Sequence, residues 1–278
     1  MTRKERINKI SKDKKEMLKL KKASIKFTDG NTTAPTKLTN VTKAELPTDT
    51  EDSVYRSIVG NTYYWVDSHD DVHVKGCFTK SIQENKPFFL KDHEFKTGSK
   101  IGEFLQTKEV IVEWKDLGVE IEGSTISLVH DAEIKREYNE SLFVQYKENK
   151  INQHSVGMIY VKIDLAYDDP SDKEAFALYS KILPELGNME EAKEKGFFFV
   201  VSEAKLQETS AVLRGSNSLT GVLENSENKE EQIIKLIKEL GDIEKIDNIC
   251  DKIKETYKSE PLENDTQTRK PSIFDNLI

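Results

Sequence analysis

The chain has 278 residues, which is enough for one large domain, or for a medium-sized domain with extensions, and for a hydrophobic core. Charged residues make up 33% of the chain against 36% hydrophobic residues, so part of its length should be solvated helix or tail. The net charge of -8 argues against a protein whose whole surface neutralises nucleic-acid phosphates.

The cysteines and the N-terminal residues indicate the cellular compartment in which the protein is expected. Cys77 and Cys250 lie far apart without CxxC spacing, which is typical of free thiols in a reducing compartment. The N-terminal MTRKERINKISKDKKEM is charged where a signal peptide is apolar, and no run approaches the roughly 18 apolar residues of a membrane span. We therefore expect a soluble intracellular protein without a membrane partner.

The first part of the chain, residues 1–52, is predicted to be a basic N-terminal arm followed by a linker. Residues 3–22 are rich in lysine with a partial apolar stripe, as in a basic helix or a disordered arm. A solvated helix is the simpler interpretation, and contact with an acidic partner or with nucleic acid is the alternative. Residues 28–52 are rich in Thr, Asn, Asp, Pro and Gly, which is typical of a linker.

Residues 53–215 have the pattern of a β domain. Residues 132–149 predict an amphipathic helix, residues 155–167 a strand, residues 171–195 helix, and residues 197–213 a pair of strands. Several short strands in succession favour a barrel or a sandwich. Before the first predicted helix, the strand candidates are SVYRSIV, TYYWV, DVHV, PFFL, Ile101 to Phe104, EVIVEW, GVEIE and STISLV.

Residues 216–278 are predicted to be a linker, amphipathic C-terminal helices and a tail. Isoleucines and leucines recur with helical period from about residue 230 to 258, interrupted by Gly241. Such an apolar face packs on its own domain, on a second copy of the chain, or on a different protein such as a scaffold.

Imidazole chemistry is limited to five histidines, at positions 69, 73, 93, 130 and 154. His93 follows the apolar strand PFFL and precedes a turn, a place where a base is easily held. Taken alone, a histidine at a strand end is more often a surface or capping residue than a catalyst.

A serine and a glutamate are the other candidates for chemistry. Ser155 stands where a polar segment meets an apolar strand, and Gly157 would allow close approach of another backbone. Glu208 is a carboxylate within an otherwise apolar strand, where an ionised group needs a cationic or hydrogen-bonding partner. Acyl transfer by serine requires a base within hydrogen-bond reach and an acceptor that orients that base.

Metal and nucleotide chemistry have weaker signals. His69 and His73, with Asp67, Asp70 and Asp71, could be a metal cluster, but no second ligand pair has suitable spacing, so we interpret this segment as an acidic surface turn. The sequence contains no P-loop, GxGxxG or GxSxG motif. We expect no metal and no cofactor.

Four ordered motifs resemble those of the tailed-phage prohead protease family. They are DSHDDVHVKGCF, LKDHEFKTGSKIGE, HSVGM and LQETSAV. In that family an Asp-rich turn ends in Gly-x-Phe, a His-acidic turn precedes Ile-Gly, a strand contains Ser, then Val or Ile, then Gly, then an aromatic residue or Met, and a later strand contains Leu-x-Glu-x-Ser-x-Val. The resemblance covers roughly residues 58–215. A departure is RGSNS after Val212, where the family often has Pro-Ala-Asn, and it affects the end of the domain.

The resemblance implies an α+β fold with a mainly β core, a closed β-barrel ringed by helices as in the herpesvirus assembly proteases. It implies that Ser155 is the nucleophile and His93 the general base. The family's motif glutamate falls on Glu208 as third member. Because herpesvirus relatives use a second histidine there, His130 and His154 remain alternatives. His154 ranks lower because its side chain should point away from the face of Ser155.

The function implied is that of a serine endopeptidase which processes phage capsid and scaffold proteins during prohead maturation. Its substrates would be the major capsid protein, the scaffold (delta-type) region and the protease itself, with cuts in residues 24–52 or 215–230. We expect it in the host cytoplasm, inside the assembling prohead, and able to self-associate as a homodimer or higher oligomer. The alternative is a non-enzymatic capsid-assembly or scaffold protein.

Overall fold

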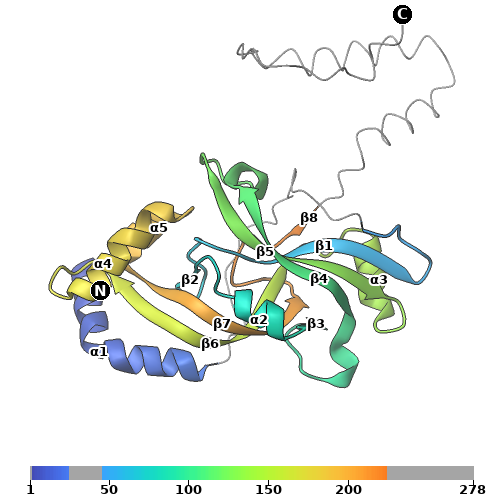
Figure 1. Cartoon of the computed structure of the whole chain (residues 1–278), viewed down its shortest axis with the longest axis horizontal. Helices are drawn as coiled ribbons and strands as arrows, with labels where there is room; N and C mark the ends of the chain where they lie inside the picture. Colours follow the sequence, from blue (N-terminus) through green and yellow to red (C-terminus); the bar gives the residue numbers. More distant parts are fainter. Residues whose placement is uncertain (1, 25–45, 224–278) are drawn as a thin grey trace, which may run out of the picture. The chain divides into compact units, whose positions relative to one another are not determined.

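The computed structural model describes residues 2–24 and 46–223. The chain divides into two compact units, Met1–Ser226 and Glu227–Ile278, and all described residues belong to the first (Figure 1). The predicted helices over residues 230–258, most of the linker, and Cys250 lie outside the described residues. No helix in the described ranges is long and apolar enough to cross a membrane.

Eight strands and five α-helices make up the described part of the chain. The strands are β1 Ser53–Thr62, β2 Asp71–His73, β3 Phe88–Lys91, β4 Lys100–Glu113, β5 Ser124–Lys135, β6 His154–Tyr167, β7 Phe197–Ala211 and β8 Val222–Leu223. The helices are α1 Arg3–Ala23, α2 Thr79–Glu84, α3 Glu140–Lys147, α4 Lys173–Ile182 and α5 Met189–Lys195, with 3-10 turns at Thr97–Ser99, Trp114–Leu117 and Leu183–Glu185.

The strands form one mixed sheet with the order β2-β7-β3-β4-β5-β1-β8, in which β6 pairs with β7. The long strand β7 is the centre of the site region, because it is antiparallel to β6 and parallel to both β2 and β3. Figure 1 shows β6 and β7 running side by side along their whole length. A parallel β3-β7 pair requires a crossover connection, which places residues distant in sequence on adjacent strands.

The expected closed β-barrel is wrong, because the sheet is open. Its strand order runs from β2 to β8, with β6 as a further partner of β7. The segment before β8 bonds to both β1 and β6, since Val59 N–H donates to Gly221 O and His154 N–H donates to Thr220 O. Only the two residues of β8 pair with β1 as a strand, so no ladder joins β8 to β6. The α+β class with a mainly β core is correct.

Several predicted elements differ from those observed. The segment 132–149 is not one helix, since its first residues extend β5 and the helix begins only at Glu140. Ile134 pairs with both Val54 and Gly102, so strand pairing overrides the helical spacing of its apolar residues. TYYWV is not a separate strand, because β1 ends at Thr62, and GVEIE lies in a loop.

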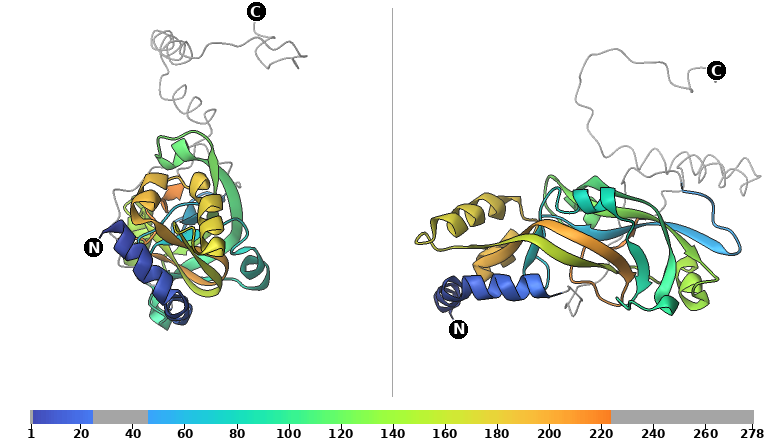
Figure 2. Two further views of the ribbon diagram at one scale, coloured as in Figure 1. Left: turned by 90° about the vertical axis from the view of Figure 1, so that its left-hand side faces the viewer. Right: turned by 60° about the horizontal axis from the view of Figure 1, so that its bottom comes forward.

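Helix α1 packs on the sheet and is not a free arm. Its buried Ile7 and Ile10 join a hydrophobic cluster with residues of β6 and β7. Three ion pairs connect it to the body, Arg3–Asp168 at 2.6 Å, Lys14–Asp172 at 2.8 Å and Lys21–Asp71 at 2.9 Å. Figure 2 shows α1 beside this end of the sheet.

Candidate active site

One face of three adjacent strands carries the predicted site. In the register of β6, β7 and β3, Ser155 is opposite Ser210, which is opposite Leu90. In the next row Gly157 is opposite Glu208. Because directly opposed residues point to the same side of a sheet and the alternation has period two, these side chains share a face.

His93 lies in the turn that leaves β3. Asp92 N–H donates to Ala211 O at 3.0 Å, which ties the turn to the end of β7. Asp92 and His93 have φ values of 50° and 55°, so two consecutive non-glycine residues adopt the left-handed region. Such conformations cost free energy and persist where surrounding contacts enforce them, which is frequent at functional sites.

The imidazole of His93 contacts the carboxylate of Glu208. Nδ1 of His93 and Oε1 of Glu208 are 2.6 Å apart. Glu208 is fully buried, and His93 is 9% exposed. A carboxylate at this distance accepts a hydrogen bond from Nδ1–H, which fixes the ring's tautomer and leaves Nε2 to act as a base.

Ser210 connects His93 and Glu208 a second time. Its hydroxyl donates to Oε2 of Glu208 at 2.6 Å and accepts the backbone N–H of His93 at 3.1 Å. Both oxygens of the buried carboxylate therefore have partners, which offsets the cost of its desolvation. The sequence motifs do not single out Ser210, although its position two residues after Glu208 on a strand places it on the same face.

Gly157 makes room for Glu208. A Cβ atom built on Gly157 would lie 2.0 Å from Oε1 of Glu208, so only glycine fits beneath the carboxylate. The close neighbour of Gly157 is thus a side chain, not the backbone that the sequence suggested. Since His93 Nδ1 is 2.6 Å from the same oxygen, the imidazole lies near Gly157 of β6, and Ser155 is two residues from Gly157 on the same face of that strand.

Ser155 is 2% exposed, and its Oγ has no hydrogen-bond partner among the described residues. No hydrogen bond between Ser155 and His93 is therefore formed in this state. Catalytic hydrogen bonds are often long in the absence of substrate and tighten in the complex. The structure thus brings His93 and Glu208 into contact and places Ser155 in the adjacent row.

His154 is on β6 and points away from the face of Ser155, whereas His130 is on β5 and contacts Thr209 on the face of β7 opposite to Glu208. His154 bonds Tyr146 OH at 2.8 Å and Thr220 O at 3.0 Å, and burial lowers its pKa to about 4. His130 bonds the hydroxyls of Thr107 and Thr209, each at 2.9 Å. Burial first, and then the charge of His154, lower the pKa of His130 to about 3. Neither histidine contacts Glu208.

The segment with His69 and His73 is part of the interior rather than a surface turn. Asp67, Asp71 and His73 are buried, and Asp71 pairs with Lys21 and accepts a 2.5 Å hydrogen bond from Tyr160 OH. Within the residues that the structure describes, no group of three His, Cys, Asp or Glu side chains could hold a metal ion.

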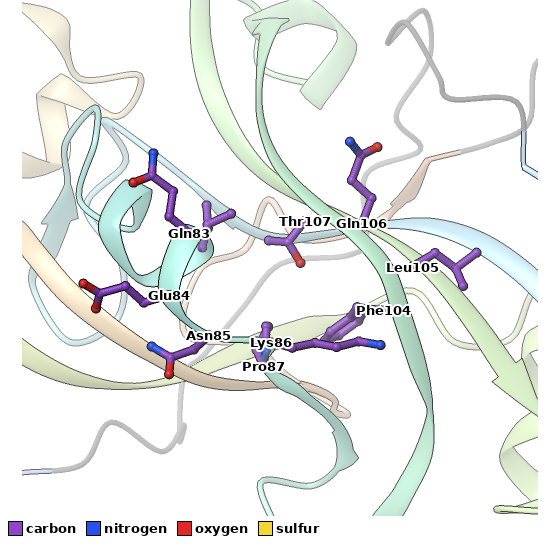
Figure 3. Close-up of a pocket in the computed structure, with 10 residues that line it drawn as sticks. Gln83, Glu84, Asn85, Lys86, Pro87, Phe104, Leu105, Gln106 and Thr107 are labelled. Atoms are coloured by element: carbon purple, nitrogen blue, oxygen red, sulfur yellow. The ribbon is translucent and has the colours of Figure 1, made fainter.

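A groove of about 380 Å³ lies between α2 and β4 (Figure 3). Its walls come from residues 82–87 on one side and from Phe104 to Thr107 on the other. Neither Ser155, His93 nor Glu208 lines it. Thr107 lines this groove, and its hydroxyl bonds the buried His130.

Comparison with known proteins adds no relative: no family model, curated protein or solved structure matches the chain.

Proposed function

We propose that the chain is a serine endopeptidase of the prohead-maturation type, with Ser155 as nucleophile, His93 as general base and Glu208 as the residue that orients the base. The observation that supports this most directly is the 2.6 Å contact between His93 Nδ1 and Glu208 Oε1, held over Gly157 in the row next to Ser155. Of the three proposed residues, His93 and Glu208 are in contact, and Ser155 stands two residues from Gly157 on β6.

The proposed reaction is acyl transfer. Oγ of Ser155 attacks the peptide carbonyl carbon while its proton passes to Nε2 of His93, and the carbonyl electron pair moves onto oxygen. When the tetrahedral species collapses, the C–N bond breaks and the leaving amine takes the proton from His93. Water then attacks the acyl-enzyme while His93 takes its proton, the ester C–O bond to Ser155 breaks, and His93 returns the proton to Oγ as the carboxylic acid product leaves.

The buried carboxylate has a defined part in this scheme. As His93 takes the proton of Ser155 it becomes an imidazolium, whose charge Glu208 stabilises across 2.6 Å in a water-excluded site. Ser210 keeps the second carboxylate oxygen occupied, so Glu208 retains one orientation throughout.

The substrates belong to the same proposal and rest on the motif resemblance. They are the major capsid protein, the scaffold region and the chain itself, processed inside the assembling prohead. The self-cleavage sites are expected in residues 24–52 and 215–230, of which residues 25–45 and 224–230 lie outside the described residues, whereas most of residues 215–223 are buried. Exposed connecting segments are the preferred sites of proteolytic nicking.

The test is self-processing of the full chain. The purified protein, incubated alone and with co-expressed capsid protein, should give shorter products by intact-mass measurement, and Ser155→Ala should give none. Ser57→Ala is a matched control, since Ser57 is another buried strand serine, bonded to Asp131 away from the site.

Circular dichroism would establish that both variants are folded. Processing that continues unchanged in a folded Ser155→Ala protein would refute the enzymatic proposal and leave the capsid-assembly role.

A further inference from the structure

A second buried polar side chain near Ser155 lacks a partner. Gln153 is 5% exposed, and among the described residues neither Oε1 nor Nε2 of its carboxamide makes a hydrogen bond. Buried polar groups in folded proteins are nearly always hydrogen-bonded, because an unsatisfied one costs free energy. An orphaned carboxamide in the interior therefore indicates a group reserved for a ligand.

The backbone places Gln153 on the face of the candidate site. Gln153 O accepts a hydrogen bond from Val212 N–H at 3.1 Å, one position beyond the pair His154 and Ala211. The β6-β7 ladder thus continues for one more residue. Because side chains alternate along a strand, Gln153 points to the same side as Ser155, two positions later.

Ser155 Oγ and the Gln153 carboxamide are thus two unpartnered buried polar groups at alternate positions of one strand. An acyl-transfer site needs a hydroxyl that attacks the carbonyl carbon and an N–H group that donates to the carbonyl oxygen. Ser155 and Gln153 carry groups of these two kinds. During attack the carbonyl oxygen of the substrate gains a full negative charge and needs a donor positioned in advance.

We propose that the Nε2–H of Gln153 donates a hydrogen bond to this oxyanion and that Gln153 is a further catalytic residue. The inference rests on the proposed function, since it assigns the donor for the same reaction. The oxyanion forms as the carbonyl π electrons move onto oxygen, and its hydrogen bond to Gln153 is released when the C–N bond breaks. Gln153 loses no proton in either step.

The decisive variant is Gln153→Met, which keeps the length of the side chain and removes its polar atoms. With a fluorogenic peptide spanning the mapped self-cleavage site, kcat should fall about 10²- to 10³-fold, while KM changes less than threefold. The urea midpoint of unfolding should stay the same or rise, because an unsatisfied carboxamide has been removed.

Gln153→Glu is the second variant, since an ionised carboxylate has the same shape but cannot donate, and it should lose kcat equally. Gln207→Met is the matched control on β7, where the amide bonds only Leu206 O at 3.5 Å, and it should retain kcat. A kcat within threefold of the parent in a folded Gln153→Met protein would overturn the inference, as would a kcat loss accompanied by a lower urea midpoint, which indicates a structural amide.

A fluorophosphonate probe separates this inference from the function on which it rests. The probe phosphonylates an activated serine, and its phosphoryl oxygen takes the place of the oxyanion. Absence of labelling at Ser155 in the parent protein would refute the protease itself. Labelling of Ser155 at the same rate in the parent and in Gln153→Met would refute only the role of Gln153, and at least a tenfold slower labelling would support it.

Discussion

Oε1 of Glu208 lies 2.0 Å from the position that a Cβ would take on Gly157, so the carboxylate proposed to orient His93 packs directly against the strand that carries Ser155. We predict that Gly157→Ala displaces the carboxylate from His93 and lowers kcat at least 100-fold, because the base loses its orienting partner. The measurement is steady-state hydrolysis of the self-cleavage peptide.

Gly98→Ala is the control for this change, since a Cβ on Gly98 would meet no atom within 4 Å. It should keep activity within about twofold, as for a surface substitution away from special features. Full activity in Gly157→Ala would show that Glu208 is not needed over β6.

Glu208→Gln tests the third member of the site. A carboxamide can accept from Nδ1–H but carries no charge for the imidazolium, and it can instead donate and favour the wrong tautomer, so kcat should fall about 10³- to 10⁴-fold. His130→Gln should retain most activity, because His130 bonds two threonines on the other face. The reverse ranking of the two variants would transfer the role to His130.

Ser210→Ala should weaken the site without abolishing it. The change removes one donor to Glu208 and the acceptor of the His93 backbone N–H, and we expect kcat to fall about 10- to 100-fold with KM unchanged. The ¹⁵N shifts of the His93 ring should report a less uniform tautomer. Ser81→Ala, which removes a buried hydroxyl bonded to Leu206 N–H, should leave both kcat and these shifts unaltered.

Stability should fall as the pH drops below about 6.5, the ordinary pKa of histidine. Burial lowers the pKa of His130 to about 3 and that of His154 to about 4, so both stay neutral in the fold while the unfolded chain takes up protons. The free energy of unfolding is therefore highest above pH 6.5. Between pH 6.5 and about pH 4 it falls by about 1.4 kcal/mol per pH unit for each histidine.

Urea unfolding at pH 7.5 and at pH 4.5 measures this dependence, and the two histidines together should account for roughly 5 kcal/mol. His130→Gln should remove about half of that difference. An identical pH dependence in the variant would mean that His130 is protonated in the folded protein.

The sequence motifs predict that His93 and Glu208 belong to one site, and the structure places these two side chains in contact. The motifs do not contain the way in which the side chains are held. The place of Gly157 beneath Glu208 depends on the register between β6 and β7, and that of Ser210 beside His93 depends on the register between β3 and β7. Motif spacing contains neither register.

The sequence could not predict whether the sheet closes into a barrel, because closure also depends on which strands pair. Alternating apolar residues indicate strands but not whether the last strand pairs with the first. Here the segment ending at Gly221 bonds β1 through Val59 and β6 through His154, yet only Val222–Leu223 pairs with β1 as a strand. A loop thus lies between β1 and β6, where a closed barrel would have a strand ladder.

The ion pairs of α1 have a consequence for partners of opposite charge. Arg3, Lys14 and Lys21 are already neutralised by aspartates of the same chain. A polyanion that took all three cations from their aspartates would compete with the contacts that hold α1 and keep Ile7 and Ile10 buried. Low ionic strength strengthens both the ion pairs within the chain and the attraction of the polyanion, so it favours neither over the other.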